Sequence, residues 1–270
     1  MDLIGNPLEW FITMKSLTSI LLTVLVICTL LGHTLVYAQA NTASKGNHPV
    51  LVELFTSEGC SSCPSADLAM AELQNEYATS KKPVYFIAYH VDYWNYLGWK
   101  DRFSSPAYTE RQQAYAQTFN LSSIYTPQSI VNGKAELVGS KKELLRKLID
   151  QELDTPISSH LSLKAHIDKK NNTLQVQYTF DGNPSSSEIQ FMLVDKIQHT
   201  QVKRGENAGR ALAHINVLRQ WIHEKASEKG TTTIQIRTGI QISNIRLIAF
   251  IQRNSDKRIV VAGEVTGIGD

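Results

Sequence analysis

Residues 50–64 read VLVELFTSEGCSSCP, and this stretch decides which fold the sequence predicts. Its first part, residues 50–55, is an apolar run that predicts a short buried strand, and residues 61–78 predict a helix with apolar side chains toward one side. A second apolar run of strand length covers residues 84–89 and follows a proline. The sequence therefore predicts a β-α-β unit whose helix begins at a C-x-x-C motif.

The segment that follows continues the alternation of helices and strands. A Ser-Pro step predicts the start of a polar helix within about residues 104–120, because proline suits the first helical position. Residues 128–131 and 135–138 flank an Asn-Gly dipeptide, which is typical of a hairpin turn. An amphipathic helix is predicted over residues 141–153. The order over residues 49–155 is therefore β-α-β-α-β-β-α, with the polar helix as an insertion.

Beyond residue 155 the hydrophobic pattern changes from helical periods to alternation. Alternating apolar residues predict half-buried strands, and Asp-Gly, Asn-Pro and Ser-rich turns separate them. This pattern is typical of an antiparallel β-sandwich. We therefore predict a domain boundary near residue 155 and a β-rich, sandwich-like C-terminal domain over residues 156–270. The predicted strands lie within residues 161–167, 174–180, 189–193, 232–237, 245–252 and 258–264.

The N-terminus carries the pattern of a secretory signal peptide. Lys15 precedes an almost uncharged apolar run, residues 17–31, and the small-residue sequence Ala-Gln-Ala at 38–40 fits a cleavage site. Met14, directly before Lys15, is an alternative start of the chain. The apolar run is shorter than the ~20 residues that a membrane span needs, which favours cleavage over an uncleaved anchor. We expect a secreted or periplasmic protein that lacks residues 1–40 and has no remaining membrane span.

Composition and charge exclude several classes of protein. The chain has 270 residues and a net charge of +2, so it lacks the basic footprint of a nucleic-acid-binding protein. Its 42% apolar residues exclude a wholly disordered chain. The three cysteines are Cys28, inside the signal peptide, and Cys60 and Cys63, beyond a polar linker at residues 41–48. The exported chain therefore keeps one cysteine pair, which an oxidising compartment can convert to a disulfide.

The C-x-x-C motif is the strongest chemical signal in the sequence. Free N–H groups and partial positive charge at a helix start stabilise a thiolate on Cys60, which suits it to attack a partner. Cys63, one turn along the helix, would then resolve the mixed disulfide. Two alternatives stay open. One is a permanent disulfide that braces the helix in a non-enzymatic binding protein, and the other is a Cu or Zn site formed by Cys60 and Cys63 with or without His90.

Thr126 and Pro127 directly precede the predicted hairpin strand. A C-x-x-C at the first helix, a proline that opens the third strand and an Asn-Gly hairpin before the last helix together resemble the thioredoxin fold. The resemblance implies that the peptide bond between Thr126 and Pro127 is cis and that Pro127 faces the cysteine pair. It also implies that Thr126 offers backbone hydrogen bonds to an incoming chain.

One departure from thioredoxin concerns the carboxylate that thioredoxin buries shortly before its first cysteine. This chain has Leu54 at that position, and Glu53 is adjacent. Glu53 is a candidate proton acceptor for Cys63. Successive side chains of a strand point to opposite faces, so the alternation directs Glu53 away from the motif, and a structural contact of its carboxylate is the alternative.

Five longer motifs resemble a narrower family. They are VELFTSEGC at residues 52–60, YHVDYW at 89–94, LGWKD at 97–101, YTPQ at 125–128 and RGENAGR at 204–210. Together they resemble the bacterial secreted family called domain of unknown function 1223, and the resemblance extends over residues 50–263. That family is assigned a thioredoxin-like fold without an established reaction. The resemblance therefore implies the fold and leaves the activity open.

Four further features carry weaker signals. Residues 89–103 contain six aromatic side chains, which suit either ligand contact or a core beneath an inserted helix. His90 and Asp92 share a face of the extended strand, so an orienting hydrogen bond would fit a proton shuttle, and a structural histidine is the alternative. Glu58 is expected to be a solvated loop residue, because its charge would oppose a nearby thiolate. The turn at 204–210 fits an anion or peptide site, or an Arg–Glu clamp at a domain boundary.

The sequence thus predicts an exported, two-domain protein whose thioredoxin-like domain carries a redox pair. Its expected activity is thiol–disulfide exchange with a thiol- or disulfide-bearing envelope protein, with Cys60 as the attacking and Cys63 as the resolving thiol. The sequence predicts no cofactor, no nucleic-acid partner and no particular oligomeric state.

Overall fold

The computed structural model describes residues 47–265 and residue 268. These residues belong to one compact unit. The predicted signal peptide, the alternative start at Met14 and most of the predicted linker lie outside the described residues. No helix in the described part of the chain has the length and the apolar character that a bilayer span requires.

The first half of the described chain alternates strands and helices in the predicted order. Helices α2 and α3 begin with proline, which costs no hydrogen bond at the first helical position because that N–H has no partner within a helix. A short 3-10 helix, η1 (Asn95–Leu97), is an addition to the predicted elements. The other elements are β1 (Val50–Thr56), α2 (Pro64–Thr79), β2 (Val84–His90), α3 (Pro106–Thr118), β3 (Gln128–Val131), β4 (Ala135–Val138) and α4 (Lys142–Leu153).

The second half of the described chain consists mainly of strands. The sequence pattern did not predict β8, because polar residues such as His214, Asn216 and Gln220 occupy buried positions in it. The alternation of apolar side chains that marks the other strands is therefore weak there. The elements are β5 (Leu161–Asp168), β6 (Thr173–Phe180), β7 (Ser187–Gln201), β8 (Ala211–Lys225), β9 (Lys229–Gln235), the 3-10 helix η2 (Ile242–Asn244), β10 (Ile245–Arg253) and β11 (Ile259–Val265).

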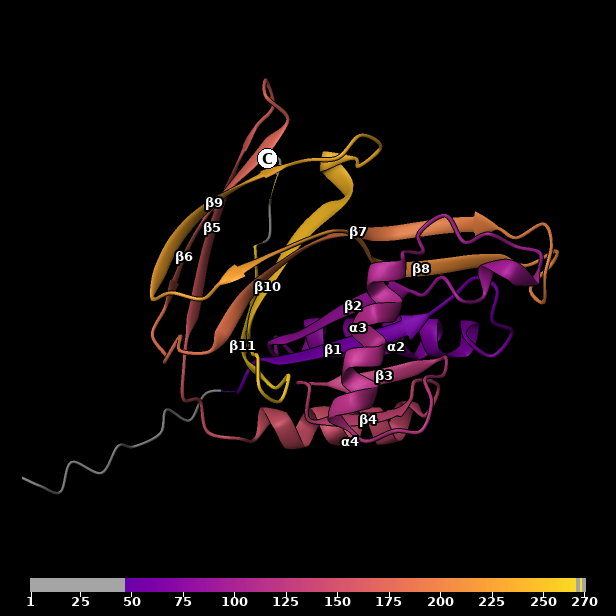
Figure 1. Cartoon of the computed structure of the whole chain (residues 1–270), viewed down its shortest axis with the longest axis horizontal. Coiled ribbons are helices and arrows are strands. Elements are labelled where there is room, and N and C mark those ends of the chain that lie inside the picture. Colours follow the sequence, from indigo (N-terminus) through magenta and orange to yellow (C-terminus); the bar gives the residue numbers. More distant parts are fainter. Residues whose placement is uncertain (1–46, 266–267, 269–270) are drawn as a thin grey trace, which may run out of the picture. The chain divides into compact units, whose positions relative to one another are not determined.

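One large mixed sheet joins both halves of the chain. Its strand order is β11-β10-β7-β8-β2-β1-β3-β4. Strands β1 and β2 are parallel along their whole length, whereas β2 meets β8 in parallel through one register pair, Ala88 with Val217. Figure 1 shows β2 and β8 side by side. The boundary that the sequence pattern suggests near residue 155 therefore does not divide this sheet.

A three-stranded antiparallel sheet, in the order β5-β6-β9, forms a second layer. Alternate residues of β6, from Leu174 to Phe180, are buried and pack against residues of β7 and β10 such as Phe191 and Ala249. The two layers share one apolar core, as expected for sheets that each have a hydrophobic face. The C-terminal strands thus contribute to both layers.

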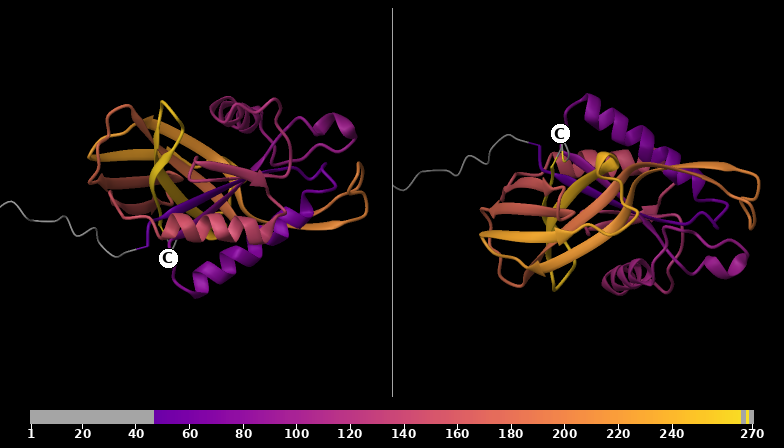
Figure 2. Two further views of the ribbon diagram at one scale, coloured as in Figure 1. Left: turned by 90° about the horizontal axis from the view of Figure 1, so that it is seen from below. Right: turned by 90° about the horizontal axis from the view of Figure 1, so that it is seen from above.

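Strand β1 is buried along its whole length, because helices cover both faces of the sheet around it. Val52 and Leu54 face the core beneath α2 and α4, whereas Leu51 and Phe55 face the core beneath α3. Figure 2 shows α2 and α4 together on one side of the sheet and α3 on the other. The loop at the carboxyl end of β1 leads into α2 and carries the C-x-x-C motif.

Candidate functional site

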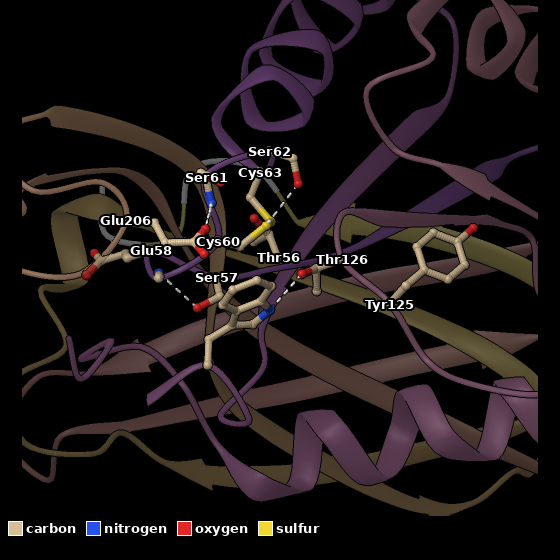
Figure 3. The surroundings of a disulfide bond; sticks show 12 residues. Thr56, Ser57, Glu58, Cys60, Ser61, Ser62, Cys63, Tyr125, Thr126 and Glu206 are labelled. Atoms are coloured by element: carbon tan, nitrogen blue, oxygen red, sulfur yellow. Dashed lines mark hydrogen bonds between the residues drawn. A yellow bond between two sulfur atoms is a disulfide. The ribbon is translucent and has the colours of Figure 1, made fainter. Parts of the chain in front are cut away.

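Cys60 and Cys63 form a disulfide at the junction of β1 and α2 (Figure 3). Cys63 is the N-terminal capping residue of α2, and its carbonyl accepts the backbone N–H groups of Ala66 and Asp67 at 2.8 and 3.1 Å. The backbone N–H of Cys63 donates to the Cys60 carbonyl at 3.2 Å. The disulfide therefore lies at the positive end of α2, which favours a thiolate there.

Both cysteines of this disulfide are fully buried. Ser61 and Ser62, between them in the sequence, are exposed, and the Ser62 hydroxyl lies 3.3 Å from the Cys60 sulfur. The disulfide is thus covered in this oxidised state. The Cys60 sulfur becomes accessible only when the residues around it move.

Thr126 belongs to the surroundings of the disulfide, and its hydroxyl accepts a hydrogen bond from the Trp94 indole at 2.8 Å (Figure 3). The peptide bond between Thr126 and Pro127 is cis. The Pro127 carbonyl accepts the backbone N–H of Gly139 at 2.9 Å, which ties the start of β3 to the end of β4. The structure therefore brings Thr126 to the cysteine pair.

Glu53 lies in the core beneath α3, on the face of β1 that α2 does not cover. Its carboxylate accepts hydrogen bonds from Arg111 Nε at 2.7 Å and from the Tyr115 hydroxyl at 2.5 Å. Burial acts to lower the pKa of Arg111, but Glu53, through its charge and hydrogen bond, together with Tyr115 and Tyr89 holds that pKa above its usual value. Because both carboxylate oxygens are occupied, the structure does not place Glu53 to take a proton from Cys63.

His90 pairs with Asp101 and not with Asp92. His90 Nδ1 and an Asp101 carboxylate oxygen are 2.6 Å apart, and both side chains are fully buried. Burial acts to lower the pKa of His90, but the charge and hydrogen bond of Asp101, together with the charges of Asp67 and Glu58, raise it overall. Burial likewise acts to raise the pKa of Asp101, but His90 and the backbone N–H groups of Glu58 and Phe103 together lower it, so His90 and Asp101 form an ion pair. The expected contact with Asp92 is wrong because β2 ends at His90, and Asp92 instead accepts the Thr109 hydroxyl at 2.6 Å.

Glu58 is fully buried, so the expectation of a solvated loop residue is wrong. One carboxylate oxygen of Glu58 accepts the Trp99 indole N–H at 2.7 Å, and its backbone N–H donates to Asp101 at 2.9 Å. The physical reason is that the loop after β2, which carries Trp99 and Asp101, folds back over Glu58 and excludes water from its carboxylate.

His214 and Asp67 are buried beside Glu58 and His90, and sequence reasoning did not single them out as site residues. His214, on β8, has Nε2 at 3.7 Å from Glu58 and Nδ1 at 3.5 Å from Asp67, and its ring centre lies 4.8 Å from that of His90. Asp67 is in the first turn of α2, and this acidic residue one turn after the second cysteine was the available signal. The buried cluster therefore consists of Glu58, Asp67, His90, Asp101 and His214.

The arginine-containing turn between β7 and β8 contacts the C-x-x-C segment directly. Glu206 accepts the backbone N–H of Ser61 at 3.0 Å, and the Asn207 amide donates to the carbonyls of Glu58 and Cys60 at 2.9 Å each. In this turn it is Glu206, and not an arginine, that binds the cysteine segment. A C-terminal segment therefore helps to cover the disulfide.

The aromatic residues after β2 divide between core and site. Tyr89 and Phe103 are buried, whereas Tyr96 is 81% exposed. Trp94 and Trp99 are half-buried. The Trp94 indole N–H donates to the Thr126 hydroxyl, and the Trp99 indole N–H donates to the Glu58 carboxylate. These two tryptophans thus orient polar side chains around the motif.

The alternative metal set of Cys60, Cys63 and His90 is not assembled in the structure. The cysteines are bonded to each other, and His90 Nδ1 is held by Asp101. Within the described residues, no three side chains of His, Cys, Asp or Glu are placed to hold a metal ion.

One known protein family matches a range of residues that includes the whole of this site. The family model described as protein of unknown function (DUF1223) matches residues 51–252. The chain belongs to the DUF1223 family. The matched range contains both cysteines, Thr126 and every member of the buried cluster. The resemblance to this family that the sequence motifs suggest is thereby confirmed.

Two solved structures are similar to this DUF1223 protein. A crystal structure of a protein from Agrobacterium tumefaciens is 25% identical with a TM-score of 0.63, and the match covers 86% of this chain and 98% of that chain. HBP35 of Porphyromonas gingivalis is 17% identical with a TM-score of 0.55, covering 82% of this chain and 75% of that chain, and this likeness shows the fold alone. No curated protein sequence is significantly similar to this chain.

Proposed function

We propose that this DUF1223 protein exchanges disulfides with a partner protein through Cys60 and Cys63. The observation that carries the proposal is the position of the pair, where a buried strand ends and the N-terminus of α2 begins. The helix dipole and free N–H groups stabilise the thiolate form of a cysteine at that position, and the thiolate is the nucleophile of disulfide exchange.

A thioredoxin-like arrangement of the elements around the pair supports this proposal. Strands β2, β1, β3 and β4 are neighbours in this order, α2 and α4 cover one face, and α3 covers the other. Thr126 lies beside the disulfide at the start of β3, where an extended segment of a partner would meet backbone hydrogen-bonding groups. We assign these elements to a thioredoxin-like unit whose sheet the C-terminal strands extend.

The exchange begins when a partner thiolate attacks the Cys60 sulfur. A bond forms between that sulfur and the partner sulfur, the bond between Cys60 and Cys63 breaks, and Cys63 leaves with the electron pair. A second partner thiol then releases the mixed disulfide, so that two electrons pass from the partner pair to this pair. In the reverse direction Cys63 performs the release. The partner's own cysteines balance the reaction in both directions.

We also propose that the partner is an envelope protein. Residues 1–40 carry the pattern of a signal peptide, and an exported chain meets an oxidising environment in which the pair forms a disulfide. The net charge of +2 provides no footprint for nucleic acid. Recognition of the partner then depends on the surface around Cys60.

Replacing the resolving cysteine should trap the partner. In the Cys63→Ser variant a mixed disulfide at Cys60 has no internal thiol to release it, so a covalent complex should accumulate in envelope extract under mild oxidation. Nonreducing electrophoresis and mass spectrometry detect the complex and the peptide linked to Cys60. The matched control, Cys60→Ser combined with Cys63→Ser, should form no such complex. If Cys63→Ser also forms none, the exchange reaction is contradicted.

One observation favours a second candidate, a permanent structural disulfide. Cys60 and Cys63 are both fully buried, and Glu206 and Asn207 close over the motif. Such a bond would brace the start of α2 in a non-enzymatic binding protein. The reduction potential of the pair separates the two candidates, because structural disulfides resist reduction more strongly.

A further inference from the structure

The buried cluster leaves polar atoms unmatched close to the place where the proposed exchange needs a proton. Among the described residues, the buried atoms without a hydrogen-bond partner include Glu58 Oε1, Asp67 Oδ1, His90 Nε2 and both ring nitrogens of His214. These four residues are at most 5% exposed. Buried polar groups normally have partners, so a concentration of unmatched donors and acceptors in one place needs an explanation.

Two carboxylates of the cluster face the two ring nitrogens of His214. His214 has one ring nitrogen 3.7 Å from Glu58 and the other 3.5 Å from Asp67, so a proton on either nitrogen faces a carboxylate. The His90 ring, paired with Asp101, packs edge-to-face against the His214 ring. Three carboxylates and two imidazoles therefore share one buried space.

Two contacts connect the buried cluster to the disulfide. The Thr56 hydroxyl donates to Asp67 at 3.4 Å, and Thr56 is one of the residues that surround the disulfide in Figure 3. The backbone N–H of Asp67 donates to the Cys63 carbonyl at 3.1 Å, because Asp67 follows Cys63 by one helical turn. The buried cluster and the resolving cysteine are therefore neighbours through both a side chain and the backbone.

Three arginines lie beside the buried cluster. Phe103 packs against both imidazole rings, and the guanidinium carbons of Arg102 and Arg219 lie 4.5 and 5.5 Å from the centre of the Phe103 ring. Arg210 lines a surface groove together with Asp67. Within the described residues, none of these three arginines pairs with a carboxylate of the cluster.

We propose that the buried cluster supplies the proton that Cys63 takes up when the disulfide opens, and receives it back when the disulfide closes. This inference rests on the disulfide exchange proposed above. When a thiolate attacks Cys60, Cys63 leaves as a buried thiolate, a charge that an apolar environment disfavours. The Thr56 hydroxyl gives its proton to the Cys63 sulfur and takes one from Asp67, and the His214 ring nitrogen that faces Asp67 replaces the proton on Asp67. In the closing direction the proton returns along the same atoms.

The test measures how fast dithiothreitol opens the disulfide of the full chain in single-turnover experiments. Dividing each rate by the fraction of reductant that is present as thiolate leaves the dependence on pH that belongs to the protein. In the wild type this corrected rate should fall as the pH rises from about 5 to about 9, because the buried cluster loses the proton that it donates. In Thr56→Val the corrected rate should be at least about tenfold lower at the acidic end and independent of pH.

Matched variants separate proton supply from a structural role. Thr56→Ser keeps the hydroxyl and should show the wild-type profile. So should Glu72→Gln, which removes an exposed carboxylate of α2 that pairs with Lys142 of α4. Asp67→Asn should reproduce the flat profile of Thr56→Val, which itself keeps every member of the buried cluster. A wild-type corrected rate that does not change with pH, or a Thr56→Val profile parallel to it, overturns the inference. Trapping by Cys63→Ser reports on the exchange itself, so the two failures are distinguishable.

Discussion

Replacing Asp101 with Asn should lower the free energy of unfolding by about 3–5 kcal/mol, the loss expected when a buried ion pair is broken. Asp101 holds His90 at 2.6 Å and accepts the backbone N–H groups of Glu58 and Phe103 at 2.9 Å each. An amide lacks the charge, and its NH₂ end would face groups that are themselves donors. Urea denaturation followed by circular dichroism measures the loss.

The loss caused by Asp101→Asn should depend on pH in a direction that the two pKa values determine. Burial acts to lower the pKa of His90, but Asp101 raises it, so this contribution to stability is complete below 6.5 and disappears as the pH rises through the raised value. Burial acts to raise the pKa of Asp101, but His90 lowers it, so that contribution is complete above 3.8 and disappears as the pH falls through the lowered value. The variant should therefore lose most at about pH 5–6 and less once the pH exceeds the raised pKa of His90.

The matched control for Asp101→Asn is Glu76→Gln. Glu76 pairs with Arg146 at 2.9 Å, but 47% of its side chain is exposed. Solvent screens such a pair, so its removal should cost less than about 1 kcal/mol. If Asp101→Asn costs no more than Glu76→Gln at about pH 5–6, the buried ion pair between Asp101 and His90 does not exist in solution.

Replacing Arg111 with Met should also destabilise the protein by about 3–5 kcal/mol, for a reason independent of the disulfide. Arg111 holds Glu53 at 2.7 Å and donates to Gln252 and Tyr115 at 3.1 Å each in the core beneath α3. Removing the guanidinium leaves the Glu53 carboxylate in a dry site without a balancing charge. The loss is measured as the change in the free energy of unfolding in urea.

A double variant shows whether the Glu53 charge causes that loss. Adding Glu53→Gln to Arg111→Met removes the unpaired carboxylate and should recover part of the stability. Arg146→Met, which breaks a partly exposed pair with Glu76, should cost less than about 1 kcal/mol. An Arg111→Met variant as stable as Arg146→Met would mean that Arg111 does not hold the Glu53 carboxylate in solution.

The elements around the cysteines could be predicted because their signals are local. The strand before the motif, the cysteines and the Pro64 helix start are neighbours in the sequence, and strand burial and helix starts depend on nearby residues. The hairpin is a second example. Asn132 and Gly133 both have positive φ angles, 48° and 63°, which Asn and Gly adopt more readily than other residues.

The buried cluster could not be predicted because its members meet only through the order of the strands. His214 reaches Glu58 because β8 lies beside β2, and that neighbourhood rests on one register pair, Ala88 with Val217. The sequence predicts Glu58 to be solvated because the Trp99 side chain that contacts its carboxylate comes from another segment. Local periodicity carries no information about such contacts.

The reduction potential of the Cys60–Cys63 pair tests the central claim most directly. It is measured by equilibrating the full chain in thiol–disulfide buffers of defined potential, alkylating the free thiols and determining the reduced fraction by mass spectrometry. If the pair exchanges disulfides with a partner, its potential should lie between about −120 and −270 mV. A potential below about −300 mV would identify a structural disulfide and contradict the proposed exchange.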